Sequence, residues 1–311
     1  MIFLSFVFKK ERRTFGSPIP KFTLKVSLPI AKRIIILTFY FSFSSILMSV
    51  ISITDSLFFP YFMDMRHYPD RLTSKLFGIF SGKVMTLIHV PLTFSLSMAV
   101  SIISYISSAK TLPEKKQITS KGLDYMFLVN IPCTAAFVFF PETIINLVFF
   151  NTPTGSEILK HSAPLALVVS LVQFSTSVLQ GLGKFLVPVK SLLVAIPIKI
   201  VCMFVFIVVY NLNIDGCILA NLICYTVTFV MNFLELRNQV INILNLNKLF
   251  YIGVSSVIMV ITGRLILNML TGYSFVLQGS ILIVCCIAVY AVFLSIFGVV
   301  KLSTIKQLIM R

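Results

Sequence analysis

Eight segments of this sequence are long and apolar enough to cross a lipid bilayer. They lie near residues 34–59, 77–106, 123–141, 161–181, 186–210, 215–235, 249–269 and 278–300. A hydrocarbon core about 30 Å thick needs roughly 20 apolar residues in each crossing helix. Hydrophobic residues make up 58% of the chain and charged residues 12%, and no soluble domain buries so much apolar surface in this pattern. The sequence therefore predicts an all-α polytopic membrane protein with about eight transmembrane helices.

Positive charge is distributed unevenly between the two sides of these spans. Of the 26 Lys and Arg residues, four lie in loops on one side: Arg66, Arg71, Lys75 and Lys160. Four more lie within the spans: Lys83, Lys190, Lys199 and Arg264. The other 18 lie in the terminal segments and in the loops on the opposite side, which the positive-inside rule places in the cytoplasm. We therefore expect a multi-pass protein of the cytoplasmic membrane with both termini in the cytoplasm.

The remaining composition points away from nucleic-acid binding and from enzymes. A net charge of +16 can indicate a nucleic-acid partner, but here the charges are spread between helices, so we expect the lipid bilayer as partner and no nucleic acid. The six cysteines lie in apolar runs without the spacing of zinc ligands or of a disulfide framework. The three histidines are scattered, and no nucleotide-binding or nucleophile motif is found. We predict no enzyme, no catalytic residues, no metal site and no cofactor.

Hydroxyl side chains recur at helical spacing along the first two predicted spans. In the first span they are Thr38, Ser42, Ser45, Ser49, Ser52 and Ser56, and in the second Thr86, Thr93, Ser97, Ser101, Ser104 and Ser108. Spacings of three and four residues place each set along one helix face. Two interpretations remain open: small hydroxyl residues allow close helix packing in membranes, or the faces line a water-filled cavity.

Ionisable residues within the spans are the other candidates for a functional site, because such groups are costly in the bilayer and normally pair or face water. Asp55 and Lys83 are expected at similar depths near the outer ends of the first two spans, so we hypothesise that they pair or share one polar cavity; snorkelling to the interface is the alternative. Lys199 lies beside Pro197, where a proline-loosened helix exposes carbonyls. The candidate substrate or cavity residues are Asp55, Lys83, Arg264, Ser45, Ser49, Ser52 and Lys199.

Two short apolar segments are not long enough to cross the membrane. Residues 2–8 precede a basic cluster, the reverse of the order in a secretory signal, and are interpreted as the end of a preceding helix or as a surface anchor. Residues 141–150 are interpreted as an interfacial helix on the outer face or as the end of a long third span.

Several motifs resemble the stage V sporulation protein B family, which belongs to the polysaccharide-transporter branch of the multidrug/oligosaccharidyl-lipid/polysaccharide exporters, beside the lipid II flippases. The run FGIFSGKVMTLIHVP at residues 77–91 resembles the eighth helix of that family. Ala99 with the ISSA ending at 106–109, LQGLGK at 179–184 and DGCILA at 215–220 are similar to later family segments. The resemblance covers roughly residues 25–300, and the order and spacing of the motifs carry it.

The resemblance implies a fold in which this chain corresponds to half of a larger transporter. The family has about fourteen helices, arranged as two six-helix lobes usually followed by two further helices. Residues 34–240 would form the second lobe, residues 241–311 the two additional helices and a short tail, and residues 1–33 a basic cytoplasmic segment with a remnant of the preceding helix. The sequence departs from the family by lacking the first lobe and by having Ser104 where a proline is common.

The resemblance further implies a flippase or exporter that moves a lipid-linked oligosaccharide or peptidoglycan precursor across the cytoplasmic membrane by alternating access. Lys83, Arg264 and the serines would meet the pyrophosphate headgroup, and a polyprenyl-linked saccharide would be the substrate. Na⁺, H⁺ and the membrane potential are each compatible as the driving force. The missing first lobe or a second copy of the chain would complete the cleft. The alternatives are a cation-coupled drug antiporter of the multidrug and toxin extrusion branch, with Asp55 as its deep carboxylate, and a truncated remnant that does not transport.

Overall fold

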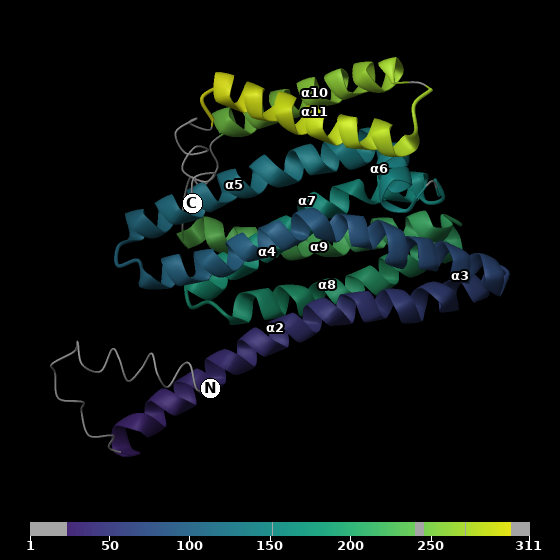
Figure 1. Cartoon of the computed structure of the whole chain (residues 1–311). Coiled ribbons are helices and arrows are strands. Elements are labelled where there is room, and N and C mark those ends of the chain that lie inside the picture. The colour runs from purple at the N-terminus through teal and green to yellow at the C-terminus, as the bar shows by residue number, and fades with distance from the viewer. Residues whose placement is uncertain (1–23, 151, 240–245, 271, 300–311) are drawn as a thin grey trace, which may run out of the picture. The chain divides into compact units, whose positions relative to one another are not determined.

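The computed structural model describes residues 24–150, 152–239, 246–270 and 272–299. It divides into two units, residues 1–40 and 41–311, and all regular structure within the described residues is helical (Figure 1). Eight of the described helical segments are long and apolar enough to cross a membrane, and each overlaps one of the eight predicted spans. The prediction of an all-α, multi-pass membrane protein is therefore confirmed. The described part of the first unit is a single stretch of helix, and the predicted remnant at residues 2–8 lies outside the described residues.

The first span lies close to its predicted position, and the second is longer than predicted. The first candidate span is Thr38–Asp64, a few residues later at each end than the predicted 34–59, and it is part of the longer helix α2 (Leu24–Asp64). Helices α3 (Asp70–Gly78) and α4 (Met85–Ser108) are joined by the π-helical turn η1 (Ile79–Val84). Together they form one uninterrupted candidate span, Asp70–Ser108.

The later helices follow the predicted spans closely. They are α5 (Leu112–Phe139), the short α6 (Pro141–Val148), α7 (Ser156–Gly181), α8 (Leu186–Phe204) with the π-helical turn η2 (Val205–Val209), α9 (Asn213–Gln239), α10 (Leu246–Met269) and α11 (Phe275–Ile296). Phe140 interrupts the helix between α5 and α6. Pro141 is the first residue of α6, a position at which proline loses no hydrogen bond. Residues 141–150 therefore contain a separate short helix rather than the end of a long third span.

Helix α7 is the centre of the larger unit. It packs against α4, α5 and α9 (Figure 1), and 67% of its most apolar stretch is buried, a larger share than in any other candidate span of the described chain. Its buried positions include small residues such as Ser162, Ala163, Ala166 and Ser170. Small side chains let helix backbones approach closely in a membrane, where lipid removes the usual hydrophobic drive between helices.

The remaining helices pack around this centre. Helix α8 packs against α9, and residues 41–64 of α2 run beside α8, as the ring contacts Phe41–Phe185 and Phe62–Phe204 indicate. Helices α10 and α11 form a pair, in which α10 contacts α5 and α11 contacts α6. The predicted boundary between the six-helix lobe and this pair, at residue 240, lies outside the described residues.

Candidate functional site

An ion pair buried among three spans is the strongest polar feature of the described bundle. The Lys199 Nζ on α8 lies 2.8 Å from the Asp55 Oδ1 on α2. Lys199 is 0% exposed and Asp55 is 7% exposed. The ammonium also donates to the Ile51 backbone carbonyl at 2.5 Å, so the contacted carbonyl belongs to α2 and not to the helix that Pro197 loosens.

Side chains of α9 satisfy the remaining hydrogen-bonding capacity of the Asp55 carboxylate. The Asn221 Nδ2 lies 3.0 Å from each of the two Asp55 oxygens, and the Cys217 Sγ lies 3.4 Å from Oδ1. A buried charge is tolerated when it is paired and its remaining hydrogen-bonding capacity is met. Asp55, Lys199 and Asn221 therefore form one closed polar cluster, which links α2, α8 and α9.

The cluster lies well inside the bundle. Asp55, Lys199 and Asn221 are nine, ten and eight residues from Asp64, Val209 and Asn213, the ends of their candidate spans. At 1.5 Å per residue these separations amount to about 12–15 Å along each helix. The three side chains therefore meet at one depth, near the middle of a hydrocarbon core about 30 Å thick.

The predicted pairing of Asp55 with Lys83 is wrong. The Lys83 Nζ, in η1, lies 3.0 Å from both the Thr152 Oγ1 and the Thr154 Oγ1 and 3.4 Å from the Thr152 carbonyl oxygen. It also lies 5.3 Å from the centre of the Phe149 ring. The long side chain reaches the polar segment between α6 and α7, where an ammonium costs less than at the depth of Asp55. Asp55 and Lys83 lie on spans that are consecutive in the sequence, but they contact different partners.

Replacing Lys83 with methionine should loosen the segment from Thr152 to Gly155 while leaving the bundle intact. Hydrogen bonds from a charged group contribute about 1.5–3 kcal/mol, so we expect exchange of the Ser156 and Leu159 amides, which donate to the Pro153 and Gly155 carbonyls, to accelerate by roughly tenfold or more. Exchange at the centres of α7 and α9 should not change. Lys75→Met is the matched control, because Lys75 is exposed on α3. Unchanged exchange at Ser156 and Leu159 would mean that the contacts of Lys83 do not hold the segment.

The predicted hydroxyl faces are exposed on the larger unit. Ser45, Ser49, Ser52 and Ser56 are exposed on α2, and three of them donate to a carbonyl one turn earlier: Ser45 to Phe41 at 3.1 Å, Ser49 to Ser45 at 3.2 Å and Ser56 to Ser52 at 3.1 Å. Thr86, Thr93, Ser97, Ser101, Ser104 and Ser108 are likewise exposed on α4. These hydroxyls are not buried in helix contacts of the described chain, so close packing within it does not account for them. Their role as the lining of an aqueous cavity stays a prediction.

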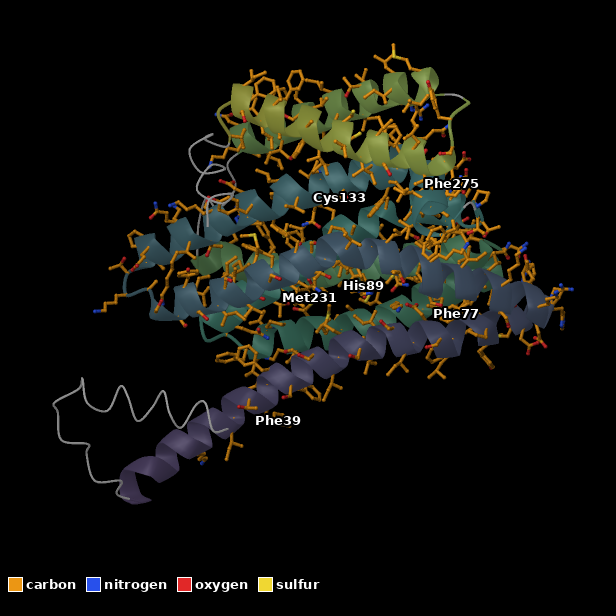
Figure 2. All side chains as sticks on the ribbon, in the orientation of Figure 1. Phe39, Phe77, His89, Cys133, Met231 and Phe275 are labelled. Atoms are coloured by element: carbon orange, nitrogen blue, oxygen red, sulfur yellow. The ribbon has the colours of Figure 1, made fainter. Side chains whose placement is uncertain are left out.

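One member of the α4 face was missed in the sequence. His89 lies three residues after Thr86 and four before Thr93, and its side chain is exposed on α4 (Figure 2). The same spacing rule that selected the hydroxyls also selects this imidazole, although the three histidines are scattered relative to one another. Below, "the hydroxyl face" means Ser45, Ser49, Ser52 and Ser56 on α2 with Thr86, His89, Thr93, Ser97 and Ser101 on α4.

Arg264 lies in a different place from the other predicted site residues. It lines a pocket of about 490 Å³ together with residues of α5, α6 and α7, and its guanidinium carbon lies 5.9 Å from the centre of the Phe139 ring. Among the described residues that line this pocket there is no other predicted candidate. The seven candidates therefore divide among the buried cluster, the Lys83 contact, the hydroxyl face and this pocket.

Two further buried amides link helices in the interior of the bundle. The Asn130 Nδ2 on α5 donates to the Ser95 Oγ on α4 at 2.8 Å, and its Oδ1 accepts from the Ser170 Oγ on α7 at 2.7 Å. On α9, the Asn232 Oδ1 accepts from the Ser191 Oγ on α8 at 2.9 Å. Such interhelical hydrogen bonds stabilise packing in a membrane by about 0.6 kcal/mol on average. An asparagine inside an apolar run was the available sequence signal for both.

The arrangement thus combines a rigid polar interior with uncovered polar surface on two spans. Chemically, the buried cluster fixes the positions of α2, α8 and α9, and the hydroxyl face offers hydrogen bonds to water or to a polar ligand. No protein-family model, curated protein or solved structure matches this chain.

Proposed function

We propose that this protein is one lobe of a transporter that moves a lipid-linked saccharide across the cytoplasmic membrane by alternating access. The observation that supports it is the hydroxyl face, whose side chains are exposed on two membrane spans. Polar groups at membrane depth normally face water or other protein. A cavity that admits a saccharide from water would provide this surrounding, while the polyprenyl tail of the substrate stays in lipid.

A second lobe would complete the cavity. The hydroxyl face needs a wall opposite α2 and α4, and a separate first lobe or a second copy of this chain would supply it. The resemblance of FGIFSGKVMTLIHVP (77–91) and LQGLGK (179–184) to the polysaccharide-transporter branch supports the same assignment. That resemblance also favours cytoplasmic termini, in agreement with the side on which the Lys and Arg residues gather.

The buried cluster favours the flippase over a cation-coupled drug antiporter. An antiporter needs a carboxylate that is free to bind Na⁺ or H⁺ within the membrane. Asp55 is the deep carboxylate of the described bundle, and the Lys199 ammonium already neutralises it at 2.8 Å. We therefore assign this pair to holding α2 against α8, so that the hydroxyl face of α2 moves with the bundle.

Transport by the reconstituted chain is the direct test. Vesicles that contain the chain and a fluorescent lipid-linked saccharide are mixed with a membrane-impermeant quencher, and the protected fraction is followed with time. With a second copy of the chain as the opposite wall, we expect the chain to move the lipid between leaflets faster than protein-free vesicles do. The variant carrying Ser45→Leu, Ser49→Leu and Ser52→Leu should move the lipid at least about tenfold more slowly. Leucine removes the hydroxyl groups from this face of α2, while it remains favourable in a membrane helix.

The matched control is Ser280→Leu, which replaces an exposed serine on α11, away from the hydroxyl face. This variant should transport at the rate of the original chain. Transport no faster than in protein-free vesicles, by a chain that is folded, would contradict a transporter built from this chain alone. Uptake of a cationic dye driven by a Na⁺ or H⁺ gradient, without movement of the lipid, would favour the antiporter.

A further inference from the structure

The pocket beside Arg264 has a composition that the proposed transport cycle does not use. Two basic and two acidic side chains line it: Arg264 on α10, Lys160 and Glu157 on α7, and Glu142 on α6. Phe139, Phe140 and Pro141, at the junction of α5 and α6, form its apolar wall. The formal charges of these four side chains cancel, so the pocket does not favour a multiply charged anion such as pyrophosphate.

The opposite charges in this pocket do not neutralise one another directly. No ion pair among the described residues joins Arg264 or Lys160 to Glu142 or Glu157, and the one acid with a basic neighbour is Glu157, whose Oε2 lies 3.9 Å from the His161 Nε2. All four side chains are exposed. Two cations and two carboxylates that share a pocket without pairing with one another are available to a ligand that carries both signs of charge.

An apolar track leads along α10 to this pocket. Val257, Ile261 and Leu265 repeat every four residues and are 59%, 55% and 57% exposed, and Arg264 lies three residues after Ile261, on the same face. Arg264 is five residues from Met269, the end of α10, which is about 7.5 Å at 1.5 Å per residue. A guanidinium at this depth lies close to the level of lipid headgroups, and the apolar track is continuous with the acyl region.

We propose that this pocket binds the headgroup of a phospholipid that carries a primary amine, as in phosphatidylethanolamine. Arg264 and Lys160 donate to the phosphate, for which the guanidinium offers paired N–H donors. Glu142 and Glu157 accept from the ammonium, whose three N–H groups a quaternary amine lacks. The acyl chains lie along Val257, Ile261 and Leu265. The ligand is a resident lipid on α5, α6, α7 and α10, distinct from the transported lipid.

The test measures lipid binding to the purified, delipidated chain by native mass spectrometry. The probes are phosphatidylethanolamine, phosphatidylcholine and phosphatidylglycerol with identical acyl chains, and glycerophosphoethanolamine as the headgroup without a tail. We expect phosphatidylethanolamine to bind most tightly. Arg264→Gln should weaken it by about tenfold or more, as expected for the loss of a charged hydrogen bond. Arg71→Gln, an exposed arginine on α3, is the matched control and should not change binding.

The acidic side of the pocket has its own variant. Glu142→Gln with Glu157→Gln should remove the preference for phosphatidylethanolamine over phosphatidylglycerol, because the ammonium then has no carboxylate partner. Competition by glycerophosphoethanolamine at equal concentration would support recognition of the headgroup but overturn the assignment of the apolar track. Equal binding of all three lipids, or binding insensitive to Arg264→Gln in a folded variant, would overturn the site.

Discussion

Lys199→Met is expected to lower the free energy of unfolding by about 3–5 kcal/mol, the usual cost of removing one partner from a buried ion pair. The substitution leaves the Asp55 carboxylate among α2, α8 and α9 with Asn221 and Cys217 as its remaining side-chain partners. Those neutral groups cannot balance its charge in a low-dielectric interior. The measurement is denaturant unfolding of the protein in mixed micelles, compared with the original chain.

The double variant Asp55→Asn with Lys199→Met separates the charge from the packing. It removes both charges while keeping side chains of similar size, so we expect it to recover most of the stability lost in the single variant. Lys190→Met is the control, since Lys190 is exposed on the same helix and should cost little. If the double variant is as unstable as the sum of the two single variants, the two side chains do not act as a pair.

Cysteines placed on the hydroxyl face are expected to react with a membrane-impermeant maleimide at least about tenfold faster than cysteines on the neighbouring apolar face, because the reactive thiolate forms in water. The test positions are Ser45→Cys, Ser49→Cys and Ser52→Cys. Their controls are Ile46→Cys and Ile53→Cys, which lie on the same helix at the same depths and are 56% and 51% exposed. A difference in labelling between the serine and the isoleucine positions would therefore not arise merely because one set is buried.

The background in this experiment is the labelling of the six native cysteines, measured on the chain without added cysteines in the same vesicles. A saccharide-sized ligand or a second lobe should slow labelling at the serine positions and not at Ile46 or Ile53. Equal, slow labelling at all five positions would place the hydroxyl face against lipid or protein and would remove the main support for an aqueous cavity.

The eight spans could be predicted because each is a long apolar run, and the length of such a run is set by the thickness of the bilayer. Helix α2 extends beyond the apolar run that predicted the first span, because Lys32 and Arg33 end that run but a helix needs no apolar residues to continue. Likewise α6 was recognised as a short segment, while its separation from α5 follows from Phe140 and Pro141 together.

The partners of the buried charges could not be predicted in the same way. Asp55 was assigned to Lys83 because the two residues are expected at similar depths on consecutive spans, but its partner Lys199 lies 144 positions along the chain, on α8. Which helices lie side by side depends on the packing of the whole bundle, in which small buried residues such as Ser170 and Ala166 let α7 approach its neighbours closely. A periodic pattern shows which residues share one face of a helix, but not what that face contacts. The positions of the hydroxyls on α2 and α4 could therefore be predicted, whereas the water, lipid or protein beside them could not.

The hydrogen bonds within the hydroxyl face bear on which part of a substrate it can hold. A serine hydroxyl has one proton and two lone pairs, and Ser45, Ser49, Ser97 and Ser101 each donate that proton to the carbonyl one turn earlier. These four hydroxyls therefore present acceptors outward. A pyrophosphate offers only acceptors and gains nothing from such a surface, whereas every free hydroxyl of a sugar can donate to it. On the proposed function, the hydroxyls of these two helices hold the sugar, and the phosphates must find other donors. His89, which is exposed on the same face of α4, carries a ring N–H that can serve as one.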